Sequence, residues 1–226
     1  MKKIITAAGL ALAALVSLPA AADTLYSSDF ASGNSGFTGG DNVGSQGYGA
    51  LGFGTNVYRG TSTPSADAQM ALNLANGATG VTLSLDLAVI DSWDGANCCG
   101  PDYFTVKVDG NVLFNVNFDN YDNTGANTDA GLTALSYGSN LGFNSSFNDA
   151  AYGLSLNLGD LSAGSHSFEF IASGIGWQGG DDESFALGNV VVSGKSNTLA
   201  VPEPENAALL LAGLAALGAV ARRRAR

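Results

Sequence analysis

Apolar and polar residues alternate along several stretches in the middle of the chain, and a period of two residues is typical of half-buried β-strands. The clearest stretch is 81–90, where every second residue is apolar and is expected to face a core. Those inward positions are Val81, Leu83, Leu85, Leu87 and Val89. Shorter stretches of the same kind lie at 103–108, 112–118, 152–158, 165–172 and 184–193. The pattern predicts a strand at each of these places.

Turn residues separate these stretches and predict short connections between antiparallel strands. Asp109-Gly110-Asn111 joins 103–108 to 112–118, and Asp-Gly between two alternating runs indicates a β-hairpin, because Gly readily adopts a positive φ. A second turn is expected at 159–164, and the Gly-rich stretch 31–60 is expected to hold short strands and long loops. Together these features predict an all-β domain over 23–197, a two-sheet antiparallel sandwich of jelly-roll type.

The N-terminal segment 1–22 has the three parts of a secretory signal peptide. Lys2 and Lys3 form a positive start, 4–18 form an apolar run, and the alanines 20–22 offer small residues for cleavage before Asp23. The segment predicts export through the inner membrane and is not expected to be part of the folded domain. An uncleaved membrane anchor is the alternative interpretation.

The C-terminal segment predicts a second hydrophobic element, a transmembrane helix at 207–221. This run of 15 residues carries no charge, and a cluster of arginines at 222–226 follows it. Spanning the hydrocarbon takes about 20 apolar residues, so snorkelling arginines and local thinning must make up the difference. The arginines are expected to stay in the cytoplasm, which places the residues before Val201 outside the inner membrane. A soluble amphipathic helix is the alternative.

A linker at 198–206 contains the motif Val201-Pro202-Glu203-Pro204. Pro204 is suited to the first position of a helix, where its missing N–H costs little. The order of motif, apolar run and terminal arginines resembles the PEP-CTERM sorting signal of Gram-negative bacteria. This resemblance implies recognition by an exosortase, a membrane transpeptidase-like cysteine enzyme that cuts near the motif, with transient residence in the inner membrane. It implies delivery from the periplasmic side to the cell surface or extracellular matrix.

The charges of the chain are strongly asymmetric. Residues 23–200 contain 18 Asp and Glu but only Arg59, Lys107 and Lys195 as basic residues. Such an acidic surface repels nucleic acid, so no nucleic-acid partner is expected. It suits solubility outside the cell, or the binding of cations such as Ca²⁺.

Two acidic stretches supply the hard oxygen ligands that Ca²⁺ prefers. One runs from Asp91 through Trp93 and the cysteines to Phe104, between the clearest strand and the predicted hairpin, and the other is 181–184. Ordinary turns, in which Asp side chains accept bonds from backbone N–H groups, are the alternative. The candidate ligands of a structural calcium ion are Asp29, Asp91, Asp94, Asp102, Asp181, Asp182 and Glu183.

The same stretches resemble pieces of secreted bacterial β-sandwich domains. An Asp-Ser-Trp-Asp-Gly loop at 91–95 leads into the hairpin, and Asp-Glu-Ser at 182–184 precedes a final strand. Ser28-Asp29-Phe30, with Gly36-Phe37 later, is similar to the first strand of jelly-roll carbohydrate-binding modules. That resemblance implies a structural Ca²⁺ between the first and last strands, although Gly188 stands where those domains have Asp before Asn189.

Cys98 and Cys99 are the only cysteines, and an exported chain meets an oxidising compartment. We predict a disulfide between these neighbours, with two free thiols or pairing with another chain as alternatives. A zinc site is not expected, because there is no second thiol pair and His166 is the sole histidine.

The candidates for chemistry on a ligand are few. His166 is expected to face outward from its strand, and no Gly-x-Ser-x-Gly motif is present, so we expect no enzyme. A pair of carboxylates for glycan hydrolysis remains the weaker alternative. Trp93 and Trp177 lie in loops, where they are candidates for stacking on sugar rings; capping the core is the other interpretation.

The sequence therefore predicts an exported, surface-sorted, non-enzymatic protein of the extracellular or exopolysaccharide matrix. The first alternative is a carbohydrate-binding module with structural calcium that holds an exopolysaccharide. In either case the working parts are a signal peptide, a β-sandwich and a sorting tail.

Overall fold

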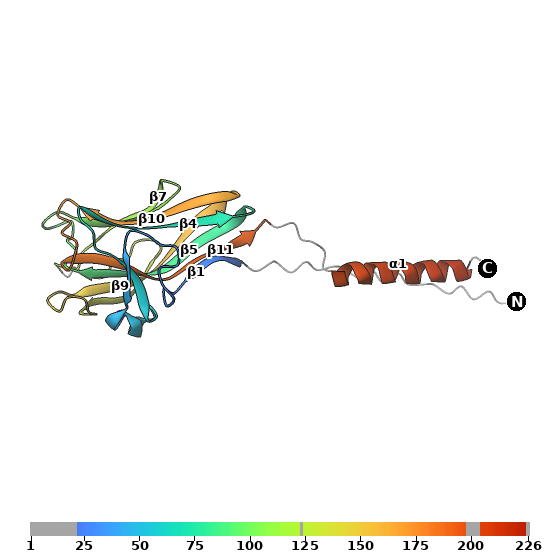
Figure 1. The fold of residues 1–226 in the computed structure, drawn as a ribbon, viewed down its shortest axis with the longest axis horizontal. Coiled ribbons are helices and arrows are strands. Elements are labelled where there is room, and N and C mark those ends of the chain that lie inside the picture. The colour runs from blue at the N-terminus through green and yellow to red at the C-terminus, as the bar shows by residue number, and fades with distance from the viewer. Residues whose placement is uncertain (1–21, 123, 198–203, 225–226) are drawn as a thin grey trace.

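A computed structural model describes residues 22–122, 124–197 and 204–224, and in these ranges the chain forms two packed antiparallel β-sheets and one α-helix (Figure 1). The predicted signal peptide, most of the linker and the last two residues lie outside the described residues. In chain order the elements are β1 (Asp23–Ser28), β2 (Asp41–Gly44), the 3₁₀ helix η1 (Gln46–Leu51), β3 (Asn56–Gly60), β4 (Ser65–Leu74), β5 (Ala78–Asp91), β6 (Asp102–Val108), β7 (Asn111–Phe118), β8 (Leu132–Ser139), β9 (Asp149–Leu161), β10 (Gly164–Gly174), β11 (Glu183–Ser196) and α1 (Pro204–Arg224).

The larger sheet has seven strands and the smaller sheet has four. The larger sheet runs β2-β3-β11-β5-β9-β8, and β1 also pairs with β11. The smaller sheet runs β4-β10-β6-β7. Strand β11 can serve β3 and β1 on the same side because they take different halves of it: Phe185–Leu187 pair with β3 and Val190–Gly194 with β1. Asn189, with a φ of 43°, lies at the break between them.

The main core fills the space between the two sheets. The five inward residues predicted in the clearest strand are all buried in β5, with Leu85 the most exposed at 3%. Strands of the smaller sheet face them with Phe104 and Val106 from β6 and with Phe168 and Phe170 from β10. Alternation of apolar residues in the sequence thus becomes one shared apolar layer, as expected for a sandwich.

A second, smaller apolar cluster lies on the outer face of the larger sheet. Tyr48 from η1 and Phe53 pack against the outward residues Ala88 and Ile90 of β5. Covering this face explains why β5 is buried on both sides toward its end. The uncovered part of the same face stays polar.

All six predicted strands form, and each is one to several residues longer than its pattern indicated. The Asp-Gly turn between β6 and β7 is confirmed, with positive φ values of 52° at Asp109 and 77° at Gly110. The turn predicted at 159–164 is shorter, because β9 continues to Leu161 and β10 begins at Gly164. The all-β, two-sheet antiparallel sandwich is therefore established.

The C-terminal helix forms, and Figure 1 shows α1 well apart from the two sheets. It begins at Pro204, the position expected for a helix start. Among the described residues, no helix combines the length and the apolar character that a membrane crossing requires. The transmembrane helix predicted at 207–221 is therefore not confirmed.

Candidate metal centre

Three acidic side chains meet at one end of the sandwich, where the chain passes from the larger sheet to the smaller one. Asp94 lies in the loop after β5, Asp102 is the first residue of β6, and Glu183 is the first residue of β11. One oxygen from each carboxylate lies within 4.8 Å of the others. Asp102 and Glu183 are fully buried and Asp94 is 5% exposed. We call these three residues the acidic triad.

The loop holds Asp94 and Asp102 together through backbone bonds. The N–H of Asp94 donates to Asp102 Oδ2 at 2.8 Å, and the N–H of Asp102 donates to the carbonyl of Asp94 at 3.0 Å. Asn117 Nδ2, from the neighbouring strand β7, donates to the carbonyls of Asp94 at 3.1 Å and Asp102 at 2.8 Å. These bonds fix the direction in which the two carboxylates point.

Glu183 is fixed by the loop that precedes β11. The N–H of Gln178 donates to Glu183 Oε2 at 2.5 Å, and the N–H of Glu183 donates to the carbonyl of Gly179 at 3.3 Å. The other oxygen, Oε1, is buried and has no hydrogen-bond partner among the described residues. The same is true of Asp102 Oδ1.

The electrostatics of the acidic triad favour proton or cation uptake. Burial raises the pKa of the Asp102 carboxyl, against the opposing effect of the bond from Asp94 N–H. Burial likewise raises the pKa of Glu183, and the nearby charge of Asp102 raises it further. The pKa of Asp94 is raised by burial first and then by Asp122. Three buried carboxylates can therefore hold a metal cation, and carboxylate oxygens are ligands for hard divalent ions.

The structure brings together only these three of the seven predicted ligands. Asp29 lies directly after β1, in the hollow lined also by Asn189 and Val191 of β11, and is not part of the group. Asp181 is exposed and lies 3.9 Å from Arg59 Nη2, while Asp182 Oδ1 accepts a bond from Ser92 at 3.0 Å. The predicted ligand set was therefore too large.

Asp91 is buried but belongs to a different group of residues. Its N–H donates to Asp149 Oδ1 at 2.8 Å, and both of its carboxylate oxygens are without partners among the described residues. Burial, and then the charge of Asp149, raises the pKa of Asp91 to about 7. With a φ of 68°, Asp91 leaves the regular strand geometry, and its carboxylate is not in the triad although its backbone pairs with Glu183.

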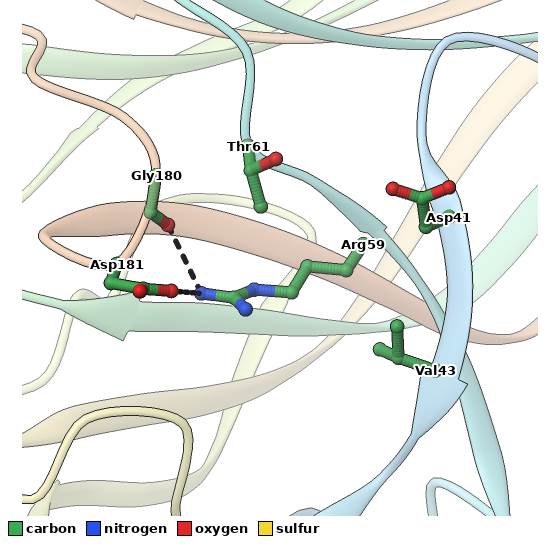
Figure 2. A pocket seen from close by; sticks show the side chains of 6 residues that line it. All are labelled: Asp41, Val43, Arg59, Thr61, Gly180 and Asp181. Carbon is green, nitrogen blue, oxygen red and sulfur yellow. Dashed lines mark hydrogen bonds and ion pairs between the residues drawn. The ribbon is translucent and has the colours of Figure 1, made fainter.

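A pocket of about 250 Å³ lies beside Arg59, on the outer side of β3 (Figure 2). Figure 2 shows one guanidinium nitrogen of Arg59 directed at both the carbonyl of Gly180 and the carboxylate of Asp181, with Asp41 across the pocket. Arg59 Nη2 donates to Gly180 at 3.1 Å, Nε donates to Ser184 Oγ at 2.9 Å, and the group lies 4.3 Å from the Phe143 ring centre. Arg59 is thus engaged in joining loops and does not neutralise the acidic triad.

Both tryptophans are part of the core, which contradicts their assignment as sugar-stacking residues. Trp93 is fully buried, Trp177 is 7% exposed, and their rings pack edge to face with centres 5.1 Å apart. Trp93 Nε1 donates to the carbonyl of Ser184 at 2.8 Å, and Trp177 Nε1 donates to that of Ser62 at 2.9 Å. With their N–H groups bonded and their faces covered, neither ring is available to a ligand.

The loop that carries Asp94 also contains a disulfide between Cys98 and Cys99. Cys98 is half-buried and Cys99 is exposed. Because the bond joins adjacent residues, it shapes this loop and cross-links no distant elements.

His166 faces inward, so its predicted outward orientation was wrong. The side chain is buried, with Nδ1 2.7 Å from Asp109 Oδ2 and Nε2 2.9 Å from the carbonyl of Ser162. The Asp109 bond, and then the Ser162 carbonyl, raises the pKa of His166. Both nitrogens face acceptors, an arrangement that favours the protonated imidazole and joins β10 to the Asp109 turn.

Sequence reasoning missed the asparagines that order this end of the molecule. Asn117 fixes the Asp94–Asp102 loop, and Asn120 Nδ2 donates to the carbonyls of Val89 and Asp91, each at 3.0 Å. A signal was present, because Asn in an otherwise apolar strand and directly after it needs a buried partner. Nothing in the sequence indicated which carbonyls those partners are.

No protein-family model and no curated protein sequence matches the chain. Among solved structures, the CBM22-1 xylan-binding domain of Xyn10C from Paenibacillus barcinonensis is 13% identical, with a TM-score of 0.37 over 80% of this chain and 100% of that one. The Agl-KA catalytic domain is 16% identical, with a TM-score of 0.35 over 76% of this chain and 27% of that one. The catalytic domain of a GH87 alpha-1,3-glucanase in complex with tetrasaccharides is 13% identical, with a TM-score of 0.36 over 81% and 30%. Likeness at this level does not indicate what this chain binds.

Proposed function

We propose that this chain is an exported, non-enzymatic protein of the cell surface or extracellular matrix, in which the β-sandwich is the displayed domain. The observation that carries the proposal is the burial of Trp93 and Trp177 against each other. Stacking on sugar rings needs solvent-facing aromatic rings, and this chain uses both of its tryptophans to close the core. The domain is therefore built for stability and display.

Export and sorting depend on the two ends of the chain. The signal peptide at 1–22 directs the protein through the inner membrane, and the motif at 201–204 is the recognition element for an exosortase. The terminal arginines at 222–226 are removed with the tail. The released protein then joins the exopolysaccharide matrix at the cell surface.

The absence of enzymatic activity is supported by how the acidic and histidine side chains are used. Asp102 and Glu183 are fully buried, so no substrate bond can reach them. His166 is tied on both nitrogens by Asp109 and Ser162 and cannot act as a base. We assign these groups to the stability of the fold.

The resident cofactor in this proposal is one structural calcium ion. The exported domain carries a large excess of acids, and the exterior of the cell supplies divalent cations. An ion that holds loops together serves a displayed domain, which must stay folded without cellular protection.

A carbohydrate-binding module is the second candidate, favoured by a polar depression on the uncovered face of the larger sheet. Two hollows of about 340 and 370 Å³ meet at Asn189, whose Nδ2 donates to Asp86 Oδ2 at 2.6 Å. Serine and threonine hydroxyls line these hollows together with glycines and with the apolar side chains of Leu85, Leu154 and Val191. Such a surface would bind sugar hydroxyls by hydrogen bonds, without stacking.

Binding of the full chain to an array of exopolysaccharides distinguishes the two candidates. The display role predicts no binding above that of a serum-albumin control. Binding that is lost in Asp86→Ala, with Asp160→Ala retaining it, would instead establish the carbohydrate-binding role. Asp160 is a suitable control because it is an exposed acid on β9, away from the depression.

A further inference from the structure

Two carboxylates of the acidic triad, those of Asp102 and Glu183, each have one buried oxygen without a hydrogen-bond partner among the described residues. In Asp102 and in Glu183, one oxygen accepts a backbone N–H, from Asp94 at 2.8 Å and from Gln178 at 2.5 Å, and the other oxygen is left without a partner. Burying an unpaired carboxylate oxygen costs free energy, and native proteins seldom tolerate it. Two such oxygens in one group need either a bound cation or a proton shared between Asp102 and Glu183.

No basic residue of the described sandwich serves this purpose. Arg59 is bonded to Gly180 and Ser184, His166 is bonded to Asp109 and Ser162, and the other basic side chains in 22–197 are Lys107 and Lys195. Lys107 lies near the end of β6 and Lys195 near the end of β11, whereas Asp102 and Glu183 are the first residues of those strands. The charge of the triad is therefore not neutralised by the chain itself.

We propose that Asp102 Oδ1, Glu183 Oε1 and the Asp94 carboxylate bind one divalent cation, and that this cation is Ca²⁺. The position differs from one between the first and last strands, because Asp29 at the end of β1 takes no part. The inference places the ion of the proposed exported domain at specific residues. It rests on the proposed function only for the source of calcium.

The chemistry of the donors selects calcium. All three side chains offer oxygen, and Ca²⁺ takes about 6–8 oxygen ligands in flexible geometry, including backbone carbonyls and water. Mg²⁺ requires near-octahedral geometry and keeps several waters, which a buried group of three acids does not favour. Zn²⁺ prefers nitrogen and sulfur, but His166 is tied elsewhere and both cysteines are in the disulfide.

Binding would join three segments that are separate along the chain. The ion bridges the disulfide-containing loop, the start of β6 and the start of β11, which belong to different sheets. The Asn117 side chain already holds the loop beside β6, so the site is largely formed before the ion arrives. A cation bound here would hold these three segments together at this end of the sandwich.

Calorimetric titration of the chelator-treated full chain with calcium chloride tests the inference, together with thermal melting. We expect one ion per chain, and at 100 times the dissociation constant a rise in Tm of roughly 5–10 °C. Mg²⁺ at the same concentration should give a much smaller rise. Absence of heat and an unchanged Tm would overturn the proposal and leave a shared proton as what satisfies the oxygens.

Two variants and one control locate the site. Glu183→Gln keeps the shape and the Gln178 bond but removes a charge, and Asp94→Asn alters the least buried ligand; each should weaken calcium binding at least tenfold. Asp181→Asn is the matched control, an exposed acid two residues away that should bind as the parent does. Calcium binding that survives both variants would overturn the assignment. Either result leaves the export proposal intact, since that is read from the C-terminus of the mature protein.

Discussion

Trp93 and Trp177 pack edge to face, with ring centres 5.1 Å apart and planes at 79°. The two residues come from loops that are far apart along the chain, one after β5 and one before β11. Their indole N–H groups bond to the carbonyls of Ser184 and Ser62. The pair therefore connects the loop after β5 with the loop before β11, and its hydrogen bonds connect both loops to β11 and to the segment after β3.

Replacing Trp93 with Phe is expected to destabilise the domain by about 1–3 kcal/mol. The change leaves the Ser184 carbonyl without the indole donor and opens space in a fully packed core. Urea denaturation followed by fluorescence or circular dichroism measures the loss. Tyr121→Phe, in an exposed loop position, should change stability little. Equal stability of Trp93→Phe and the parent would mean that Trp93 is not a core residue.

Asn120→Ala should cost about 1–3 kcal/mol, because it removes two buried hydrogen bonds from the carbonyls of Val89 and Asp91. Asn120 is 6% exposed and its amide serves both Val89 and Asp91 at the end of β5. Asn111→Ala, at an exposed position in the hairpin, is the matched control and should be close to neutral. The comparison uses chemical denaturation at one pH, and similar midpoints for the two variants would contradict this role of Asn120.

The His166–Asp109 pair should make stability depend on pH in two directions. The pKa of His166 is raised, so its contribution is complete below the ordinary value of about 6.5 and is lost as the pH rises through the raised value. The pKa of Asp109 is lowered, first by the bond to His166, so its contribution is complete above about 3.9 and is lost as the pH falls through the lowered value. The pair stabilises most between these limits.

Denaturation of the parent and of His166→Gln from pH 3 to pH 9 measures this dependence. The difference in stability should be largest near pH 5 and should narrow above pH 6.5, as the parent loses its imidazolium. A difference that stays constant across the whole range would show that His166 contributes through packing alone.

The Cys98–Cys99 disulfide should contribute little to global stability. A bond between adjacent residues encloses almost no chain and so removes little entropy from the unfolded state. Reduction, or the double change Cys98→Ser and Cys99→Ser, should shift the free energy of unfolding by less than about 1 kcal/mol. A loss of several kcal/mol would mean that the loop conformation set by the disulfide supports the whole end of the sandwich.

The fold could be predicted wherever large apolar residues alternate, and not elsewhere. β5 was evident because each inward position holds Val or Leu. β4 was missed because two of its inward positions are Ala66 and Ala68, whose small side chains give little contrast with their neighbours. β8 was missed because neither of its faces is fully buried, so its sequence has no reason to alternate.

The acidic site was predicted only in outline, for a different reason. Sequence fixes which acids share a loop, but the direction of each carboxylate depends on backbone turns and distant donors. Asp91 turns away at a positive φ, while the donors Asn117 and Gln178 orient the triad from other segments. The sequence could not decide between a core role and a sugar-stacking role for the tryptophans for the same reason. Their carbonyl partners, Ser184 and Ser62, are far away in sequence.

We propose that the C-terminal segment is a sorting signal, which is removed when the protein is delivered outside the cell. Intact mass of the protein recovered from the cell exterior tests it most directly. We predict a chain that begins at Asp23 and ends near the 201–204 motif, without Arg226. Recovery of the exterior protein with Arg226 still attached would contradict the account.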